Sequence, residues 1–424
     1  MQTAEFKITN SEEFKTKALL WAAQFRSACY FDSNNFQDPY SAFDVCIAAD
    51  AKSEITSQAG EAFEKLNIFL LKNPGFVPGF LSYDLKNETE DLVSENPDQL
   101  DFPDLYFFSP AHIILIKEKQ VNIKSDNPER IWREINRTTV PDLIETDFNG
   151  HLKSKIDKSD YLNKVDRIKQ NIRKGDIYEL NFCQEFYAAN ANLNPVHTFI
   201  KLNRISPTPF ATFFKNGDNY IISATPERFL SRRGDKLISQ PIKGTAKRFE
   251  NLEEDSISKR NLLSNEKELS ENVMIVDLVR NDLTKSAKAG TVLVEELFGI
   301  YSFKQVHQMI STVVCEPKEE LSNSEIIKNT FPMGSMTGAP KIRAMELIEK
   351  YEESKRGLYS GAVGYFSEEK NFDFNVVIRS VLYNSEKKYL SFQVGSAITI
   401  DSDPEKEYEE CLLKAEAIFK VLKP

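Results

Sequence analysis

The chain has 424 residues, of which 41% are hydrophobic and 28% charged, and its 54 basic and 64 acidic side chains give a formal net charge of −10. A chain of this length and composition buries a substantial core, which excludes intrinsic disorder, and its acidic balance argues against a nucleic-acid or anionic-membrane surface. No apolar run approaches the roughly 20 residues that a bilayer span needs, and the first residues do not resemble a signal peptide. We therefore expect a cytoplasmic protein with no nucleic-acid or membrane partner.

The first 135 or so residues mix short apolar strands with turn signals. The patterns predict strands at residues 41–49 and 111–116 and an amphipathic helix at residues 61–71. A polar stretch at residues 136–159 predicts the connection between an N-terminal domain of residues 1–140 and a second domain of residues 155–424. The periodicity of residues 160–174 predicts a helix that stops at Gly175.

The second half alternates strands and helices irregularly. Strands are predicted at residues 220–224, 229–232 and 236–239, with a hairpin turn at residues 233–235, and at residues 372–381 and 389–394. Helices are predicted at residues 266–279, 341–350 and 404–422. With no Rossmann or P-loop glycine motif, the pattern predicts a large α+β fold with mixed or antiparallel sheets.

The cysteines and histidines do not indicate a disulfide framework or a zinc site. The five cysteines are odd in number, scattered and without a C-x-x-C pair, and the four histidines lie far apart. If a metal binds, oxygen ligands must hold it, which favours Mg²⁺ over Zn²⁺.

Two pairs of glutamates are candidate metal ligands. Glu268 and Glu271 are three residues apart, so they share a helix face with apolar side chains. Glu407 and Glu410 repeat this spacing on the last predicted helix. Four converging carboxylates would hold one Mg²⁺ with positions open for a substrate carboxylate. Because the chain has 64 acidic residues, solvated helix faces are the alternative interpretation.

Lys243, Glu227 and His307 are candidates for direct chemistry. Lys243 lies in Q-P-I-K-G-T (240–245) at a predicted strand end, where it is either a nucleophile with a lowered pKa or a surface lysine beside a turn. The predicted hairpin would bring Glu227 near Lys243, where its carboxyl would serve as acid or base. His307 is more often interpreted as a core or helix-face histidine. The Gly-rich residues 331–341 open a helix whose free N–H groups suit an anion.

Seven ordered blocks of the second half together resemble one enzyme family. They are G-D-I-Y-E-L-N (175–181), P-I-K-G-T (241–245), E-N-V-M-I-V-D-L-V-R-N-D-L (271–283), F-P-M-G-S-M-T-G-A-P-K (331–341), Y-S-G-A-V-G-Y (359–365), V-V-I-R-S (376–380) and D-S-D-P-E-K-E-Y-E-E (401–410). They resemble the chorismate-utilising enzymes, which include anthranilate, aminodeoxychorismate, isochorismate and salicylate synthases. The first half resembles the family's first domain more weakly, at P-Y-S-A-F-D (39–44), G-F-L-S-Y-D-L (79–85) and F-P-D-L (102–105). The resemblance implies a β-sandwich-like core with surrounding helices.

Within this family, position 243 separates two activities. The anthranilate relatives carry Ala in the P-I-x-G-T motif, whereas the aminodeoxychorismate relatives carry Lys, as this chain does. The resemblance therefore implies amination of chorismate at C4, giving 4-amino-4-deoxychorismate for 4-aminobenzoate and folate biosynthesis. It further implies that Lys243 attacks C2 while Glu227 assists departure of the C4 hydroxyl, and that ammonia then adds at C4 and expels the lysine. Mg²⁺ would polarise the ring carboxylate.

The same matches imply roles for the other site residues. Glu271 and Glu410 would contact Mg²⁺ directly, with Glu268 and Glu407 in support. His307 takes the position of the family's active-site histidine. The implied substrate-binding residues are Arg379 and Tyr359 at the enolpyruvyl carboxylate, Ser335, Gly244, Thr245, and Gly395 in a loop that presents backbone N–H groups.

Three segments depart from the family pattern. Residues 395–397 read G-S-A and lack the second glycine of the G-A-G-like loop. Glu179 stands where many relatives have Gln and where the isochorismate and salicylate enzymes have a Lys that activates water, so those two activities are not expected. Residues 29–33 (C-Y-F-D-S) match only part of the L-L-E-S segment with which anthranilate relatives bind tryptophan, so feedback inhibition by tryptophan is not expected.

The source of nitrogen follows from the cysteines. None lies in a G-x-C-x-G nucleophile motif, so we expect no fused amidotransferase and expect ammonia from a separate glutaminase subunit. Two alternatives stay open. One is anthranilate synthase component I, and the other is a non-catalytic chorismate-binding relative.

Overall fold

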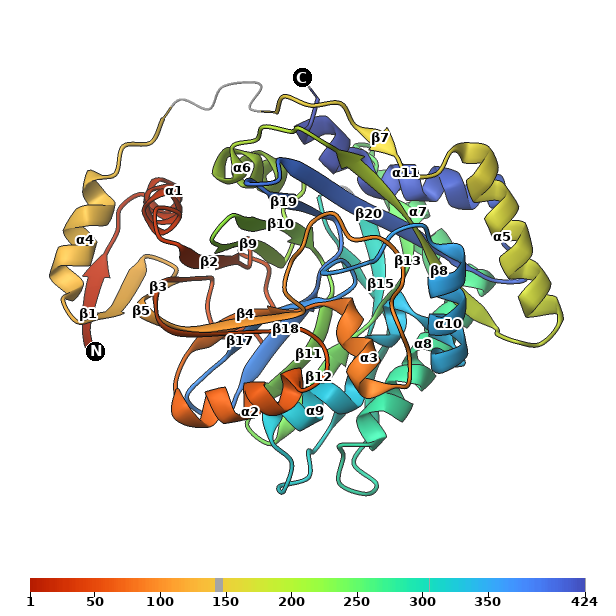
Figure 1. The fold of residues 1–424 in the computed structure, drawn as a ribbon, viewed down its shortest axis with the longest axis horizontal. Helices are drawn as coiled ribbons and strands as arrows, with labels where there is room; N and C mark the ends of the chain where they lie inside the picture. Colours follow the sequence, from red (N-terminus) through yellow and green to blue (C-terminus); the bar gives the residue numbers. More distant parts are fainter. Residues whose placement is uncertain (142–147, 305, 424) are drawn as a thin grey trace.

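Strands occupy the centre of the molecule and helices surround them (Figure 1). The computed structural model describes residues 1–141, 148–304 and 306–423. The strands are β1 (Gln2–Lys7), β2 (Ser27–Asp32), β3 (Val45–Ser57), β4 (Val77–Leu81), β5 (Leu105–Lys117), β6 (Gln120–Ser125), β7 (Lys153–Ser154), β8 (Glu179–Ala188), β9 (Phe210–Asn216), β10 (Asn219–Thr225), β11 (Arg228–Arg233), β12 (Lys236–Gln240), β13 (Ile242–Lys247), β14 (Leu293–Ser302), β15 (Val306–Cys315), β16 (Gly338–Ala339), β17 (Ala362–Phe366), β18 (Phe372–Val376), β19 (Ser380–Asn384) and β20 (Tyr389–Ile398). The helices are α1 (Ser11–Ala22), α2 (Ala62–Lys72), α3 (Lys86–Thr89), α4 (Pro128–Arg137), α5 (Lys158–Arg173), α6 (Pro195–Ile205), α7 (Leu252–Leu263), α8 (Glu266–Thr284), α9 (Asn323–Thr330), α10 (Lys341–Tyr351) and α11 (Pro404–Val421), with 3₁₀ turns η1 (Tyr83–Leu85) and η2 (Gly334–Met336).

The strand pairings among the described residues are antiparallel and form two connected runs. The first run is β7-β8-β20-β19-β10-β9-β2-β3-β5-β6-β1. The second leaves β5 through β4 and continues β17-β18-β11-β12-β15, with β13 and β14 also on β15. Strand β5 belongs to both runs because its first residues pair with β4 and its last with β6. This arrangement confirms the predicted α+β class with large antiparallel sheets.

Two hydrophobic clusters make up the core. In the first, helices α1, α4, α5, α6 and α11 cover strands of the first run. The second lies between the two runs, where Phe80 of β4 packs edge-on against Phe214 of β9 with ring centroids 5.5 Å apart. Burying an aromatic side chain of this size contributes roughly 1.5–3 kcal/mol, so these rings hold the two runs together as a sandwich.

Local signals set the ends of several elements where the sequence predicts them. Asp157 and Asp403, which precede α5 and α11, each accept a hydrogen bond from a backbone N–H three residues on. Gly175 follows α5 with φ 81°, and Gly234 turns the β11–β12 hairpin with φ 59°. The helices predicted at residues 266–279 and 341–350 are confirmed as α8 and α10, and α8 runs on to Thr284.

One prediction about chain organisation is wrong, and another stays a prediction. The strand predicted at residues 372–381 is wrong as one element, because β18 ends at Val376 and β19 begins at Ser380. Arg379 between them has φ 50°, a left-handed conformation that no continuous strand accommodates. The division at residues 140–155 stays a prediction, and residues 142–147 lie outside the described part of the chain. Strands from both sides of it pair, β2 with β9 and β4 with β17.

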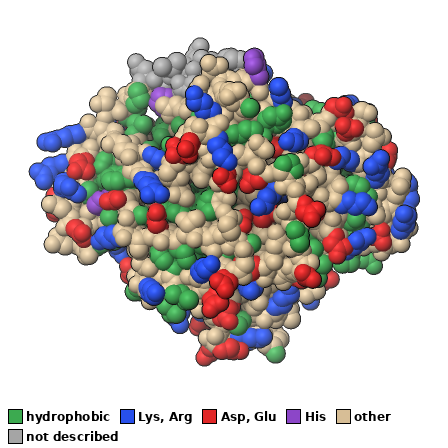
Figure 2. Space-filling model, viewed as in Figure 1, with side chains coloured by type: hydrophobic (Ala, Val, Ile, Leu, Met, Phe, Trp, Pro, Cys, Tyr) green, Lys and Arg blue, Asp and Glu red, His purple; other side chains and the backbone are tan. Residues whose placement is uncertain are grey.

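The surface carries charges of both signs. On the face in Figure 2, Lys and Arg side chains are interspersed with Asp and Glu rather than gathered into a patch of one sign. Among the described residues, no helix has the length and apolar character needed to cross a membrane.

Candidate active site

A cavity of about 950 Å³ opens between α8, α11, β13 and β20. Its walls contain all the predicted site residues except His307, and these are Glu227, Lys243, Gly244, Thr245, Glu268, Glu271, Ser335, Tyr359, Arg379, Gly395, Glu407 and Glu410. The fold therefore brings together side chains from segments that are up to about 180 residues apart (Glu227 to Glu410).

Glu227 is a buried acid at the junction of β10 and β11. Burial raises its pKa to about 7, although hydrogen bonds from Ser335 and the backbone of Ile242 and the charges of Lys243 and Arg379 act in the opposite direction. Burial likewise lowers the pKa of Arg379 to about 10, against the effect of Glu227. A carboxyl that titrates near neutrality can hold a proton for a leaving group, which suits a general acid.

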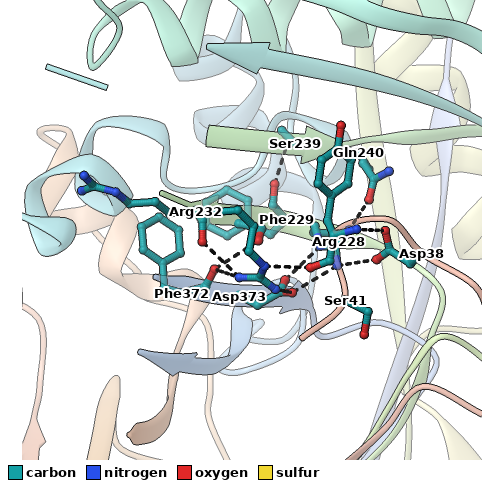
Figure 3. A network of polar contacts seen from close by, with 12 residues as sticks. Asp38, Ser41, Arg228, Phe229, Arg232, Ser239, Gln240, Phe372 and Asp373 are labelled. Carbon is teal, nitrogen blue, oxygen red and sulfur yellow. Dashed lines mark hydrogen bonds and ion pairs between the residues drawn. The ribbon is translucent and has the colours of Figure 1, made fainter. Parts of the chain in front are cut away.

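Arg228, the residue after Glu227, is held by a network of polar contacts (Figure 3). Arg228 is 1% exposed, and its guanidinium donates to Asp373 at 2.9 and 3.1 Å, to Asp38 at 2.6 Å and to Gln240 at 2.5 Å. The backbone carbonyl of Glu227 accepts a hydrogen bond from Val376 N at 3.0 Å. These bonds leave the backbone at Glu227 little freedom and tie it to the N-terminal half through Asp38.

Lys243 lies on β13, and its ammonium forms a buried ion pair with the Glu179 carboxylate. Burial alone would lower the Lys243 pKa, but the charges of Glu179, Glu271 and Glu227 raise it above its ordinary value. The Glu179 contact therefore favours the ammonium form of Lys243, and a neutral amine beside Mg²⁺ stays a prediction. The sequence motif could not reveal this, because the partner carboxylate comes from a strand 64 residues earlier.

Gly244 and Asn272 fix the main chain at Lys243. Gly244 has φ 94°, and a Cβ atom there would lie 3.2 Å from Glu268 Oε2. Any other residue would strain this turn of the chain and crowd the carboxylate. Asn272 of α8 donates to the Lys243 carbonyl at 3.5 Å and accepts from Ser311 Oγ at 2.6 Å, which joins α8 to the strand that carries the lysine.

Helices α8 and α11 present the four predicted metal ligands to the cavity, together with two lysines. Lys267 Nζ lies 3.7 Å from Glu271 and 3.3 Å from Glu407, and Lys414 Nζ lies 2.7 Å from Glu410. Burial, and then the charge of Glu410, raise the pKa of Glu268, whereas Lys414 lowers that of Glu410. The lysines thus compensate a concentration of negative charge.

The four glutamates supply carboxylate oxygens, which are the ligands that Mg²⁺ prefers. Glu271 Oε1 is buried without a hydrogen-bond partner among the described atoms, with Lys267 Nζ 3.7 Å away, and burial raises the Glu271 pKa to about 7. An oxygen left in this way suits a cation ligand. Within residues 1–141, 148–304 and 306–423, however, no three carboxylate, His or Cys side chains converge as a ready-made metal site.

His307 lies on β15 but its side chain is outside the cavity wall, whereas its neighbours Val306 and Gln308 line it. The imidazole is 2% exposed and contacts Asp255 through Nε2 at 3.1 Å and Ser302 through Nδ1 at 2.8 Å. Successive side chains of a strand point to opposite faces, which explains why His307 is not with the other predicted residues.

Gly395 lines the cavity from inside strand β20 rather than from the expected loop. Its partner in the ladder is Cys183 of β8, and a Cβ atom at position 395 would lie 2.5 Å from Cys183 Sγ and 2.6 Å from the Phe182 carbonyl. The glycine therefore allows two strands to approach closely, and its carbonyl accepts from Lys414 Nζ at 3.0 Å. Tyr359, opposite, is buried with its hydroxyl 3.5 Å from Cys183 Sγ.

A model of the chorismate binding enzyme family matches residues 14–420 of the chain. The chain belongs to this family. This chorismate binding enzyme is 33% identical over 404 residues to the anthranilate synthase component I-like protein of Synechocystis sp., with 90% of this chain and 82% of that protein covered. It is 31% identical over 360 residues to aminodeoxychorismate synthase component 1 of Bacillus subtilis, with 81% and 76% covered. The crystal structure of anthranilate synthase component I from Streptococcus pneumoniae matches with a TM-score of 0.78 at 26% identity, covering 92% of this chain and 94% of that one.

The family places the protein among the enzymes that act on chorismate. The named relatives divide between two activities at nearly equal identity, so overall similarity does not decide which reaction this chorismate binding enzyme performs.

Several residues that hold the site together were not predicted from the sequence. They are Lys267 and Lys414 among the carboxylates, and Asn272 and Arg228 as anchors. Glu179 was noted only as a departure from the family pattern, without its pairing to Lys243. The available signal was position, since Arg228 follows Glu227, and Asn272 and Glu179 lie inside the blocks 271–283 and 175–181.

Proposed function

We propose that this protein is aminodeoxychorismate synthase component I, which converts chorismate and ammonia to 4-amino-4-deoxychorismate in the cytoplasm, with a separate glutaminase subunit supplying the ammonia. The observation that carries the proposal is a buried lysine, Lys243, in one cavity with Glu227, an acid whose pKa is raised to about 7. A nucleophile and an acid in one pocket suit a displacement at C2 with loss of the C4 hydroxyl.

The reaction balances with these two groups. Neutral Lys243 Nζ forms a bond to C2, both conjugated ring double bonds shift toward C4, and the C4–O bond breaks as Glu227 gives its proton to the departing hydroxyl to form water. Ammonia then attacks C4, both double bonds shift back, and the C2–Nζ bond breaks to release the lysine. The new C4 ammonium returns a proton to Glu227, so the enzyme ends unchanged.

Substrate binding is assigned to the remaining walls. Arg379 and Tyr359 would hold the enolpyruvyl carboxylate, and Ser335, beside Glu227, would contact the substrate. Glu271 and Glu410, supported by Glu268 and Glu407, would hold Mg²⁺, which when bound would polarise the ring carboxylate.

The second candidate is anthranilate synthase component I. It is favoured by the match to the Streptococcus pneumoniae structure. The two activities differ in product, because anthranilate formation releases pyruvate and aminodeoxychorismate formation retains the enolpyruvyl group.

The test is identification of the product by mass after incubation with chorismate, Mg²⁺ and ammonium. We expect 4-amino-4-deoxychorismate, and anthranilate with pyruvate would refute the proposal. Without ammonia, we expect an adduct of chorismate minus one water on the peptide that contains Lys243. The Lys243→Ala variant should lose the adduct and still bind chorismate. Normal aminodeoxychorismate formation by that variant would mean that ammonia attacks directly.

A further inference from the structure

Lys243 lines the cavity, whereas its ion-pair partner Glu179 is buried and is not among the residues that line it. Glu179 opens β8, where it pairs with Ala339 of β16, and the Glu179 and Lys243 side chains are only 5% and 9% exposed. The two residues come from different strands, β8 and β13, so the contact depends on how the sheets meet.

Other charges also face the lysine. Glu227 from the β10–β11 junction and Glu271 from α8 act on Lys243, as do Glu268 of α8 and Glu410 and Lys414 of α11 from farther away. Among the described residues, Glu179 is the carboxylate in ion-pair contact with Lys243. It therefore fixes the position of Nζ, while the others contribute a more diffuse field.

A buried ion pair makes its members depend on each other. Each ion has lost most of its water, so removal of one partner leaves the other as an uncompensated buried charge. The ammonium must also lose its proton before Nζ can form a bond, and a carboxylate in contact opposes that loss.

We propose that Glu179 is a positioning residue for Lys243, which anchors the lysine in the cavity wall as an ammonium and sets the pH at which its amine becomes free. The part that concerns attack on the substrate rests on the proposed function. The anchoring of Lys243 and the control of its protonation do not rest on the proposed function, because both concern the protein without chorismate.

The first test is a double-mutant cycle on the thermal stability of the full chain, with Glu179→Gln, Lys243→Gln and the double variant. Each single variant should unfold at a lower temperature than the wild type, and the double variant should recover at least half of the loss caused by Lys243→Gln. Glu405→Gln, which removes an exposed ion pair with Lys158, is the control and should leave the midpoint unchanged. Equal midpoints for Lys243→Gln and the double variant would overturn the proposal.

The second test measures the reactivity of the amine directly and needs only the Glu179→Gln variant. Trace acetylation with acetic anhydride is followed by mass spectrometry, with Lys243 compared with exposed Lys7 between about pH 6 and about pH 10. Loss of the carboxylate should lower the pKa of Lys243, so labelling at neutral pH should rise by about tenfold or more, since each pKa unit is tenfold in free amine. Identical labelling curves for variant and wild type would refute the assignment.

The two proposals fail separately. If labelling and stability respond as expected but chorismate forms no adduct, the nucleophilic role is wrong and the anchoring stands. If the adduct forms and Glu179→Gln changes neither labelling nor stability, the reaction stands and Glu179 is not the positioning residue.

Discussion

At the scale of single residues, the site combines a carboxylic acid, Glu227, and an amine, Lys243, whose protonation states are coupled. Glu227 has a pKa of about 7 and Lys243 has a pKa raised above its ordinary value, so the dominant form near neutrality has the proton on the lysine. The proposed reaction requires neutral Lys243 and protonated Glu227. This minor form carries the same number of protons as the form with an ammonium Lys243 and an ionised Glu227. The two groups therefore titrate as a pair, and a pH profile reports the pair rather than either residue.

Burial of Glu227 makes stability depend on pH in a predictable direction. Its folded pKa of about 7 exceeds the ordinary 4.5, so the protonated carboxyl stabilises the fold below about pH 4.5 and this contribution is lost as the pH rises through 7. The difference corresponds to roughly 3 kcal/mol. Glu227→Gln should thus match the wild type at acidic pH and exceed its thermal midpoint above pH 7, while adduct formation falls about 10²–10⁴-fold. A wild-type midpoint that stays above the variant's at alkaline pH would contradict this.

At the scale of elements, helices α8 and α11 form the acidic wall, each with two glutamates three residues apart. Their spacing follows from the helical repeat, but their meeting depends on how α8 packs on β13 and α11 on β20. The lysines between them supply positive charge where Mg²⁺ would bind.

Glu271→Gln or Glu410→Gln should abolish turnover without unfolding the protein, because each removes a charge needed to bind Mg²⁺. The measurements are Mg²⁺ titration of activity and circular dichroism. Glu405→Gln, at an exposed position of α11, serves as the matched control and should keep its Mg²⁺ response. Full wild-type activity in EDTA would rule out the metal, as would normal Mg²⁺ dependence in both variants.

Strands β11 and β18 are joined by the Arg228–Asp373 pair, which holds Glu227 in place. Arg228→Met should destabilise the fold by roughly 1.5–3 kcal/mol, because it removes charge-assisted hydrogen bonds to Asp373, which keeps Arg233, and to Asp38. Combined Arg228→Met and Asp38→Asn, which removes the carboxylate left without its guanidinium, should recover part of that stability in denaturant unfolding. Turnover should remain low in both, since the anchor of Glu227 is lost. Recovery of turnover along with stability would mean that the network is structural only.

At the scale of the whole molecule, the described residues that line the cavity lie between Asn181 and Lys420, and the first half supports them from outside the cavity through shared sheets and through Asp38. The family match shows that the chain is among the enzymes that act on chorismate. None of its five cysteines lies in a glutaminase nucleophile motif.

The purified chain should therefore use ammonium and be inert with glutamine. Activity with ammonium should increase with pH as the fraction of free ammonia rises. The measurement is product formation with each nitrogen source, with the wild type plus a separately prepared glutaminase subunit as the positive control. Glutamine-dependent turnover by the pure chain would show that it contains its own glutaminase site.

The sequence by itself determined the local structure and the composition of the site. Helix caps such as Asp157 and Asp403, the turn at Gly234 and the paired glutamates of α8 are encoded within a few residues, because capping and helical spacing are short-range effects. The motifs likewise identified site residues that, with the exception of His307, all lie in the cavity wall. Lys243 is the residue on which the prediction of the aminodeoxychorismate activity depends, since relatives with either activity have almost the same overall identity to this chain.

Only the tertiary structure decided which charges meet. The sequence left Lys243 open between a nucleophile and a surface lysine, and it predicted an N–H-presenting loop at Gly395 and a strand through Arg379. The structure has a buried Lys243 paired with Glu179, a glycine within β20 and a break at φ 50°. Protonation depends on burial and on charges from distant strands, and close strand approach depends on the neighbouring strand. Neither the protonation of a side chain nor the spacing of two strands is a property of a short stretch of sequence. Both depend on the fold.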